Sequence, residues 1–114
     1  KDRIDHKPSG SYFVVVPANG AAGTGHGPDL VLIDEWHAWT ENRHRDTYSA
    51  LTTGSASKKN PMTIKISTQA SDLYSLAGEE FEFAKRVKNR IVNGKLITTG
   101  DFDRPSYLSV LYYL

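Results

Sequence analysis

The clearest hydrophobic pattern in the chain is the apolar run Leu30–Ile33, which is followed at once by Asp34 and Glu35. A continuous apolar run of this length, rich in β-branched residues, indicates a strand buried on both faces of a sheet. Two carboxylates therefore stand where a central strand should end. Because burying a carboxylate is costly, the end of such a strand usually offers it a cation, a metal ion or a hydrogen-bond network.

The other segments alternate between strand-like and helical patterns. Alternating or β-branched residues predict further strands over 11–16, 62–68, 95–98 and 107–114. Arg3–Asp5 is expected to end a strand that pairs with the first of these. Apolar positions at helical spacing predict one helix from Trp36 to about Thr53 and a longer one from Asp72 to Asn93.

This order of segments favours an α/β fold with a mostly parallel sheet flanked by helices. In open sheets of this kind, ligands bind at the carboxyl ends of the strands, so Asp34 and Glu35 would lie at a binding edge. No internal repeat or linker divides the 114 residues, and we expect one domain. Because the chain starts with Lys1 within polar sequence, we expect it to be a piece of a longer protein.

Composition narrows the function mainly by exclusion. The net charge of +1 gives no overall electrostatic signature for nucleic acid or a membrane surface. The absence of cysteine excludes disulfides and thiolate chemistry and suits an intracellular protein. No apolar run in the sequence is long enough to span a bilayer, and the N-terminus lacks the layout of a signal peptide.

Asp34 and Glu35 after an apolar strand form the pattern of a Walker B element. In such an element the Asp holds Mg²⁺ and the Glu polarises water for attack on a γ-phosphate. A buried strand that ends in a solvated acidic turn produces the same pattern. The neighbouring sequence therefore has to decide between the two.

Further stretches extend the pattern on both sides of the acidic pair. They are Pro28–Trp39, Arg45–Leu51, Lys58–Pro61 and Ile64–Ala70, the last of which ends in Ser67-Thr68-Gln69-Ala70. Together they resemble the ATPase domain of phage terminase large subunits, from Walker B to the motif that couples hydrolysis to DNA movement. The tail from Tyr107 to Tyr113 resembles the border between that domain and the nuclease domain.

The resemblance implies a RecA-like P-loop NTPase core that uses ATP and Mg²⁺ to drive double-stranded viral DNA into a capsid. Asp34 would then position Mg²⁺, and Glu35 would be the catalytic carboxylate. Ser67, Thr68 and Gln69 would sense the γ-phosphate and transmit its loss. The implied partners are double-stranded DNA, the portal, the small terminase subunit and further copies in a ring, in the cytoplasm of the bacterial host and without a membrane.

The chain departs from a complete motor at several points. The segment Gly20–His26 has the glycine spacing of a P-loop but carries His26 in place of the lysine, so we interpret it as a flexible loop. The resemblance places the true P-loop upstream and the nuclease carboxylates downstream, and we expect the isolated chain to be inactive. The loop before Walker B contains no arginine, which leaves Arg43 and Arg45 as candidates for an arginine finger.

Lysines and histidines suggest further contacts. Lys58 and Lys59, in a predicted loop, are candidates for contacts with DNA phosphates, which carry no sequence information. His37 and His44 are separated by about two helical turns, a poor match to a helical zinc pair. We interpret His37 as a neighbour that hydrogen-bonds the catalytic carboxylate.

Two other functions stay open. The run from Asp34 to His37 is also a D-E-x-H box, and Ser67–Ala70 stands where a helicase carries its S-A-T motif, so the chain also resembles part of a DExH-type helicase. The third interpretation is a non-enzymatic α/β binding module in which the acidic pair merely ends a strand. Both ATPase interpretations require the acidic pair and Ser67 to lie at one edge of the sheet.

Overall fold

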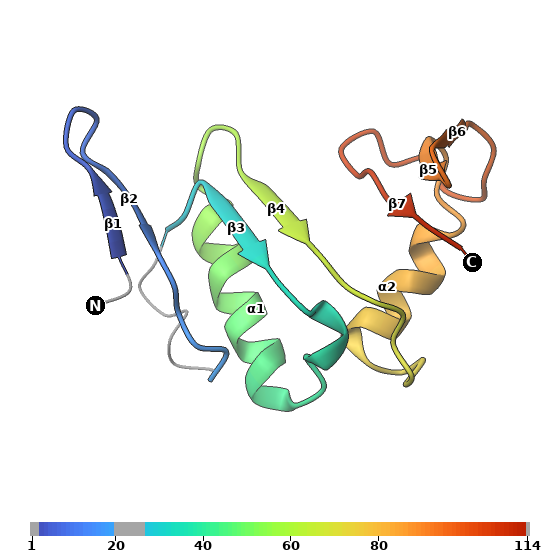
Figure 1. Ribbon diagram of the computed structural model, residues 1–114, viewed down its shortest axis with the longest axis horizontal. Helices are drawn as coiled ribbons and strands as arrows, with labels where there is room; N and C mark the ends of the chain where they lie inside the picture. Colours follow the sequence, from blue (N-terminus) through green and yellow to red (C-terminus); the bar gives the residue numbers. More distant parts are fainter. Residues whose placement is uncertain (1–2, 20–26, 114) are drawn as a thin grey trace. The chain divides into compact units, whose positions relative to one another are not determined.

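The computed structural model describes residues 3–19 and 27–113 of the chain. The chain forms two compact units. Unit 1 consists of Lys1–Leu32 and Glu41–Ile64, and unit 2 consists of Ile33–Thr40 and Lys65–Leu114. Each unit is therefore assembled from two separate stretches of sequence. The colours of Figure 1 follow the chain from residue 1 to residue 114.

Unit 1 begins with an antiparallel hairpin of β1 (Arg3–His6) and β2 (Ser11–Val14). Its register pairs Arg3 with Val14 at the open end. The prediction that Arg3–Asp5 belongs to a strand paired with the next element is confirmed. The second strand ends at Val14, two residues earlier than its β-branched composition predicts.

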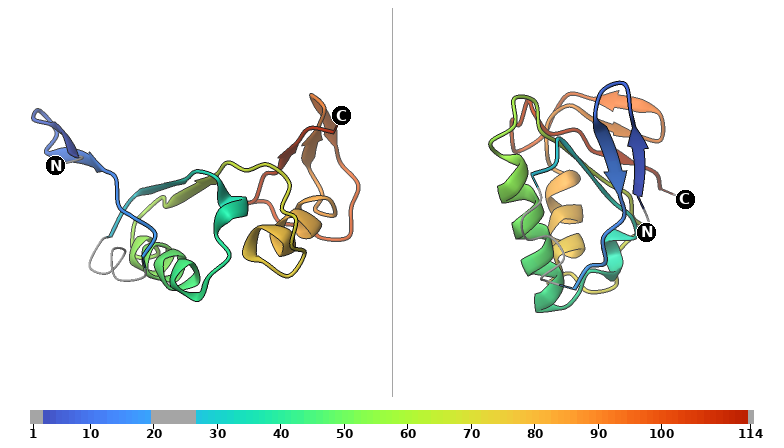
Figure 2. Two further views of the ribbon diagram at one scale, coloured as in Figure 1. Left: turned by 60° about the horizontal axis from the view of Figure 1, so that its bottom comes forward. Right: turned by 90° about the vertical axis from the view of Figure 1, so that its left-hand side faces the viewer.

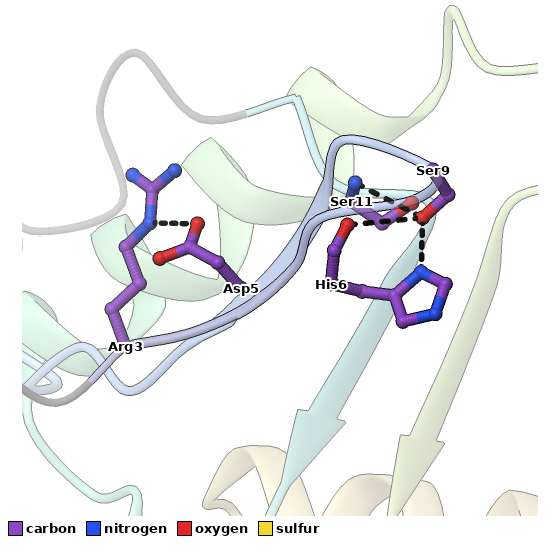
Figure 3. Close-up of polar contacts among 5 residues, drawn as sticks. All are labelled: Arg3, Asp5, His6, Ser9 and Ser11. Atoms are coloured by element: carbon purple, nitrogen blue, oxygen red, sulfur yellow. Dashed lines mark hydrogen bonds and ion pairs between the residues drawn. The ribbon is translucent and has the colours of Figure 1, made fainter.

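The turn of this hairpin is held by its own polar groups (Figure 3). The Ser9 Oγ lies 2.6 Å from His6 Nδ1 and accepts the Ser11 N–H at 3.2 Å. Gly10 follows with a φ of 75°, a left-handed conformation that glycine adopts without steric cost. A Pro-Ser-Gly sequence thus closes the hairpin through local hydrogen bonds.

β3 (Leu30–Ile33) and β4 (Met62–Lys65) form a two-stranded sheet. The Met62 N–H donates to the Asp29 carbonyl at 3.0 Å, and the Ile66 N–H donates to the Ile33 carbonyl at 2.9 Å. Because the offset in sequence is the same for both bonds, the two strands run parallel. In unit 1, α1 (Asn42–Ser55) lies along one face of this pair (Figures 1 and 2).

The burial of β3 corrects the first prediction. Val31 and Ile33 are only 6% and 3% exposed, whereas Leu30 and Leu32 are 47% and 51% exposed. β3 is therefore covered on one face, and the prediction of a strand buried on both faces is wrong. A run of apolar residues shows that both faces tolerate burial, but it does not determine how many layers of structure cover them.

The predicted helix from Trp36 to Thr53 consists of two elements. One turn of 3-10 helix, η2 (Trp36–Ala38), is followed by α1, which begins at Asn42 and ends at Ser55. Glu41 caps α1 through a reciprocal capping box, in which the His44 Nδ1 accepts the Glu41 N–H at 3.1 Å. Because Glu and His rarely form this motif, the break between the two helices has only a weak signal in the sequence.

Unit 2 contains a shorter helix than predicted. α2 spans Leu76–Ala84, and its N-cap is Ser75, whose Oγ accepts the Gly78 N–H at 3.0 Å. The prediction of a helix from Asp72 to Asn93 is therefore wrong at both ends. The residues that follow α2 form β5 (Arg90–Val92) instead.

An Asn-Gly turn explains why the helix does not continue. Asn93 and Gly94 have φ values of 48° and 84°, the pair of positive angles that joins two strands in a tight hairpin. β5 pairs antiparallel with β6 (Lys95–Ile97) through this turn and parallel with β7 (Val110–Leu111). These residues form a hairpin although the spacing of the apolar residues before it is that of a helix.

The described residues thus form three small sheets, with orders β1-β2, β3-β4 and β6-β5-β7. The α/β class is confirmed, but the sheets are mixed, and one mostly parallel sheet is not what these residues form. Among the described residues, parallel pairing occurs in β3-β4 and β5-β7, and an isolated parallel bridge joins Val87 and Phe102. In residues 3–19 and 27–113, no helix has the length and apolar character needed to cross a bilayer.

Candidate functional site

Two short segments meet at the carboxyl ends of β3 and β4. We call Asp34–Ala38 the acidic turn and Ser67–Gln69 the hydroxyl segment. The Trp36 N–H donates to the Ile66 carbonyl at 3.0 Å, which extends the parallel pairing into the acidic turn. The two segments therefore lie side by side at one edge of the strand pair, and both belong to unit 2.

The Ser67 hydroxyl forms the direct link between the two segments. Its Oγ accepts the His37 N–H at 2.9 Å, lies 3.3 Å from the His37 Nδ1, and donates to the Thr68 carbonyl at 2.6 Å. Because a hydroxyl has one hydrogen, donation to Thr68 leaves its lone pairs for the backbone N–H and a protonated Nδ1. The structure thus places the His37 ring on Ser67 rather than on a carboxylate.

The acidic turn has an unusual backbone at its second residue. Glu35 has a φ of 50° and a ψ of 48°, a left-handed conformation that few non-glycine residues adopt. The Asp34 Oδ1 accepts the Glu35 N–H at 2.9 Å and so supports this conformation. Both carboxylates are exposed at the strand end. Such backbone strain persists only where surrounding contacts enforce it.

The chemistry of this edge fits a nucleotide-bound Mg²⁺ ion. Asp34 has a second oxygen, Oδ2, for which the described residues provide no hydrogen bond. Within the described part of the chain, no group of three or more His, Cys, Asp or Glu side chains could hold a metal ion. Mg²⁺ in nucleotide sites takes one or two carboxylates and completes its shell with phosphates and waters. Asp34 is a carboxylate of that kind.

A group of interacting side chains contacts Trp36 of the acidic turn. We call it the Lys65 network, and it consists of Lys65, Glu80 and Tyr107. The Lys65 Nζ is 2.6 Å from Glu80 Oε1, and the Tyr107 hydroxyl donates to Glu80 Oε2 at 3.0 Å. The same ammonium lies 4.9 Å from the ring centroid of Trp36. Sequence reasoning missed these residues, because nothing in their spacing signals that they meet.

The remaining candidate residues lie mostly in unit 1. Arg43 and Arg45 are exposed in the first turn of α1, where Arg43 pairs with Glu41 at 2.9 Å. Lys58 and Lys59 are exposed after α1. In unit 2, Thr68 and Gln69 are exposed beside Ser67. The glycine-rich segment Gly20–His26 lies outside the described residues.

A parallel strand pair whose carboxyl ends carry an acidic turn and a hydroxyl segment is typical of α/β proteins that bind ligands at that edge of the sheet. A family model described as "Terminase large subunit, ATPase domain" matches residues 1–86. The chain belongs to this family, as its motifs predict. Terminase large subunits act in viral DNA packaging, and the matching domain is their ATPase. Comparison with curated proteins and with solved structures produced no match.

Proposed function

We propose that the chain is part of the ATP-hydrolysing motor domain of a viral terminase large subunit, extending from Walker B to the border with the nuclease domain. The observation that carries this proposal is the hydrogen bond from the His37 N–H to Ser67 Oγ at 2.9 Å. It joins the acidic turn to the hydroxyl segment, as a motor that couples hydrolysis to movement requires. Membership of the terminase ATPase family supports the same function and favours it over a DExH-type helicase.

Each carboxylate of the acidic turn has a separate role in this proposal. Glu35 accepts a hydrogen bond from the attacking water and orients it. Asp34 would hold Mg²⁺, which would partly neutralise the charge of the γ-phosphate of ATP. The exposure of both side chains supports these roles, because a catalytic carboxylate must reach its ligand.

The hydroxyl segment transmits the state of the nucleotide. Ser67 is bonded to the backbone of the acidic turn, so a shift of this turn after hydrolysis displaces Ser67, Thr68 and Gln69 together. These residues continue directly from β4. Movement at the nucleotide thereby reaches the segment of unit 2 that follows Gln69.

Basic residues of unit 1 complete the proposed machinery. Arg43 or Arg45 supplies an arginine finger to the site of a neighbouring copy, and Lys58 and Lys59 contact the phosphates of double-stranded DNA. The exposure of these four side chains supports both roles. Further proposed partners are the portal, the small terminase subunit and other copies of the large subunit in a ring.

DNA-stimulated ATP turnover by the full protein, compared with its Glu35→Gln variant, tests this function. The substitution keeps the shape of the side chain and removes its charge. We expect turnover to fall by about 100-fold or more while ATP still binds. Asp103→Asn, at an exposed carboxylate elsewhere in unit 2, is the matched control and should leave turnover unchanged. Unchanged turnover in Glu35→Gln would instead favour a binding module.

A further inference from the structure

We propose that Lys65 is a positioning residue for the ATPase site, held in place by Glu80 and Tyr107, and that it controls the chemical step rather than nucleotide binding. The inference rests on the proposed function. It concerns the Lys65 network, which contains neither the acidic turn nor the hydroxyl segment. Lys65 acts through the residues that it holds and does not touch the nucleotide.

One cation holds both segments of the site. Lys65 is the last residue of β4 and stands two positions before Ser67, so it fixes the strand that leads into the hydroxyl segment. Its Nζ also lies 4.9 Å from the ring centroid of Trp36, which directly follows Glu35. Trp36 is only 4% exposed, so this contact between ammonium and ring is shielded from water. Such contacts strengthen as they are desolvated.

The ammonium is itself held firmly. The side chains of Lys65 and Glu80 are 17% and 24% exposed, whereas those of Arg86 and Asp101, another ion pair of unit 2, are 55% and 62% exposed. Exposed ion pairs impose little order because water and salt compete for both charges. A mostly buried pair cannot exchange its partners for water so easily, and therefore fixes the position of the cation.

Both oxygens of Glu80 are engaged, which also fixes the plane of the carboxylate. Oε1 contacts Lys65 at 2.6 Å and Oε2 accepts from Tyr107 at 3.0 Å. The Tyr107 ring in turn packs edge-on against Phe83 of α2, with 5.2 Å between the ring centroids. Tyr107 lies beyond the residues that match the terminase family model. The segment after α2 therefore contributes directly to the support of the site.

The left-handed backbone of Glu35 makes this support necessary. A strained conformation is kept only when its surroundings enforce it, and displacement of a catalytic group by about 1 Å can reduce a rate by about 100-fold. Binding of ATP depends less on the orientation of Glu35, because that side chain acts on water. Loss of the Lys65 charge should therefore lower kcat and leave the KM for ATP nearly unchanged.

The test measures kcat, the KM for ATP and thermal stability in the full protein. We expect Lys65→Met, which keeps the length of the side chain, to lower kcat by about tenfold or more. Lys65→Arg should recover most of the rate because it keeps the cation. Tyr107→Phe should also lower kcat. In the Lys65→Met background it should cause little further loss of kcat, because both changes act on one network.

A double variant separates positioning from stability. Lys65→Met alone leaves the Glu80 charge half-buried without its cation, whereas Lys65→Met with Glu80→Met replaces the pair by apolar side chains, a change that is often neutral for stability. We expect the double variant to regain thermal stability but not kcat. Arg86→Met, which breaks the exposed pair with Asp101, is the matched control and should not change kcat.

Two outcomes would overturn the inference: an unchanged kcat in Lys65→Met, or recovery of kcat together with stability in the double variant. The second outcome would make the ion pair a stabilising contact only. Glu35→Gln, assayed in parallel, tests the proposed function separately. If that variant keeps full turnover, the function itself fails, whatever the Lys65 variants do.

Discussion

The link between the acidic turn and the hydroxyl segment can be tested by one deletion, Ser67→Ala. This change removes the acceptor of the His37 N–H at 2.9 Å, the contact with its Nδ1 at 3.3 Å and the bond to Thr68 at 2.6 Å. Three fully buried hydrogen bonds would together be worth about 1.5–4.5 kcal/mol. Ser67 is exposed and His37 is half-buried, so water replaces part of the loss. We expect a net weakening of about 1–2 kcal/mol.

Two assays should report this weakening in the full protein. Hydrogen exchange at the amides of the acidic turn should become about 5–30 times faster, because the free energy of local opening falls by about 1–2 kcal/mol. DNA-stimulated ATP turnover should fall by a similar factor if the bond aligns Glu35. Ser67→Thr keeps the hydroxyl and should behave like the wild type. Ser71→Ala, at an exposed serine nearby, is the matched control.

The reasoning is refuted if Ser67→Ala changes neither the exchange of the acidic turn nor the turnover. Faster exchange with unchanged turnover would refute only the functional half of the prediction. The hydroxyl segment would then support the turn without taking part in coupling.

Two glycine substitutions test the folding of unit 2. Gly78 lies near the start of α2, and Gly78→Ala would place a Cβ 2.7 Å from Leu73 Cα. We expect the unfolding free energy, measured by denaturant titration, to fall by about 1–3 kcal/mol. Gly94→Ala meets no atom within 4 Å, but its φ of 84° is unfavourable for alanine and should cost about 1 kcal/mol. A neutral Gly94→Ala would contradict a left-handed backbone at Gly94.

Much of the site could be predicted from the sequence because it depends on local order along two strands. An apolar run that ends in Asp34 and Glu35, and a second strand that ends at Ser67, suffice to place both segments at one edge once the strands are parallel. The terminase family was identified from the same residues. The Asn93-Gly94 hairpin also has a local signal, the Asn-Gly dipeptide, which competes with the helical spacing of the apolar residues before it.

Tertiary structure alone decided how these segments are supported. Glu80 lies 15 residues after Lys65, and Tyr107 lies 27 residues after Glu80. No periodicity connects these positions. The one-sided burial of β3 likewise depends on which elements cover the strand, and its residues only permit burial. Periodicity reports the conformation that each segment prefers by itself, whereas contacts between distant residues arise only after the segments pack. The sequence by itself therefore determined which carboxylates and hydroxyl groups stand at the strand ends, and packing determined what holds them in place.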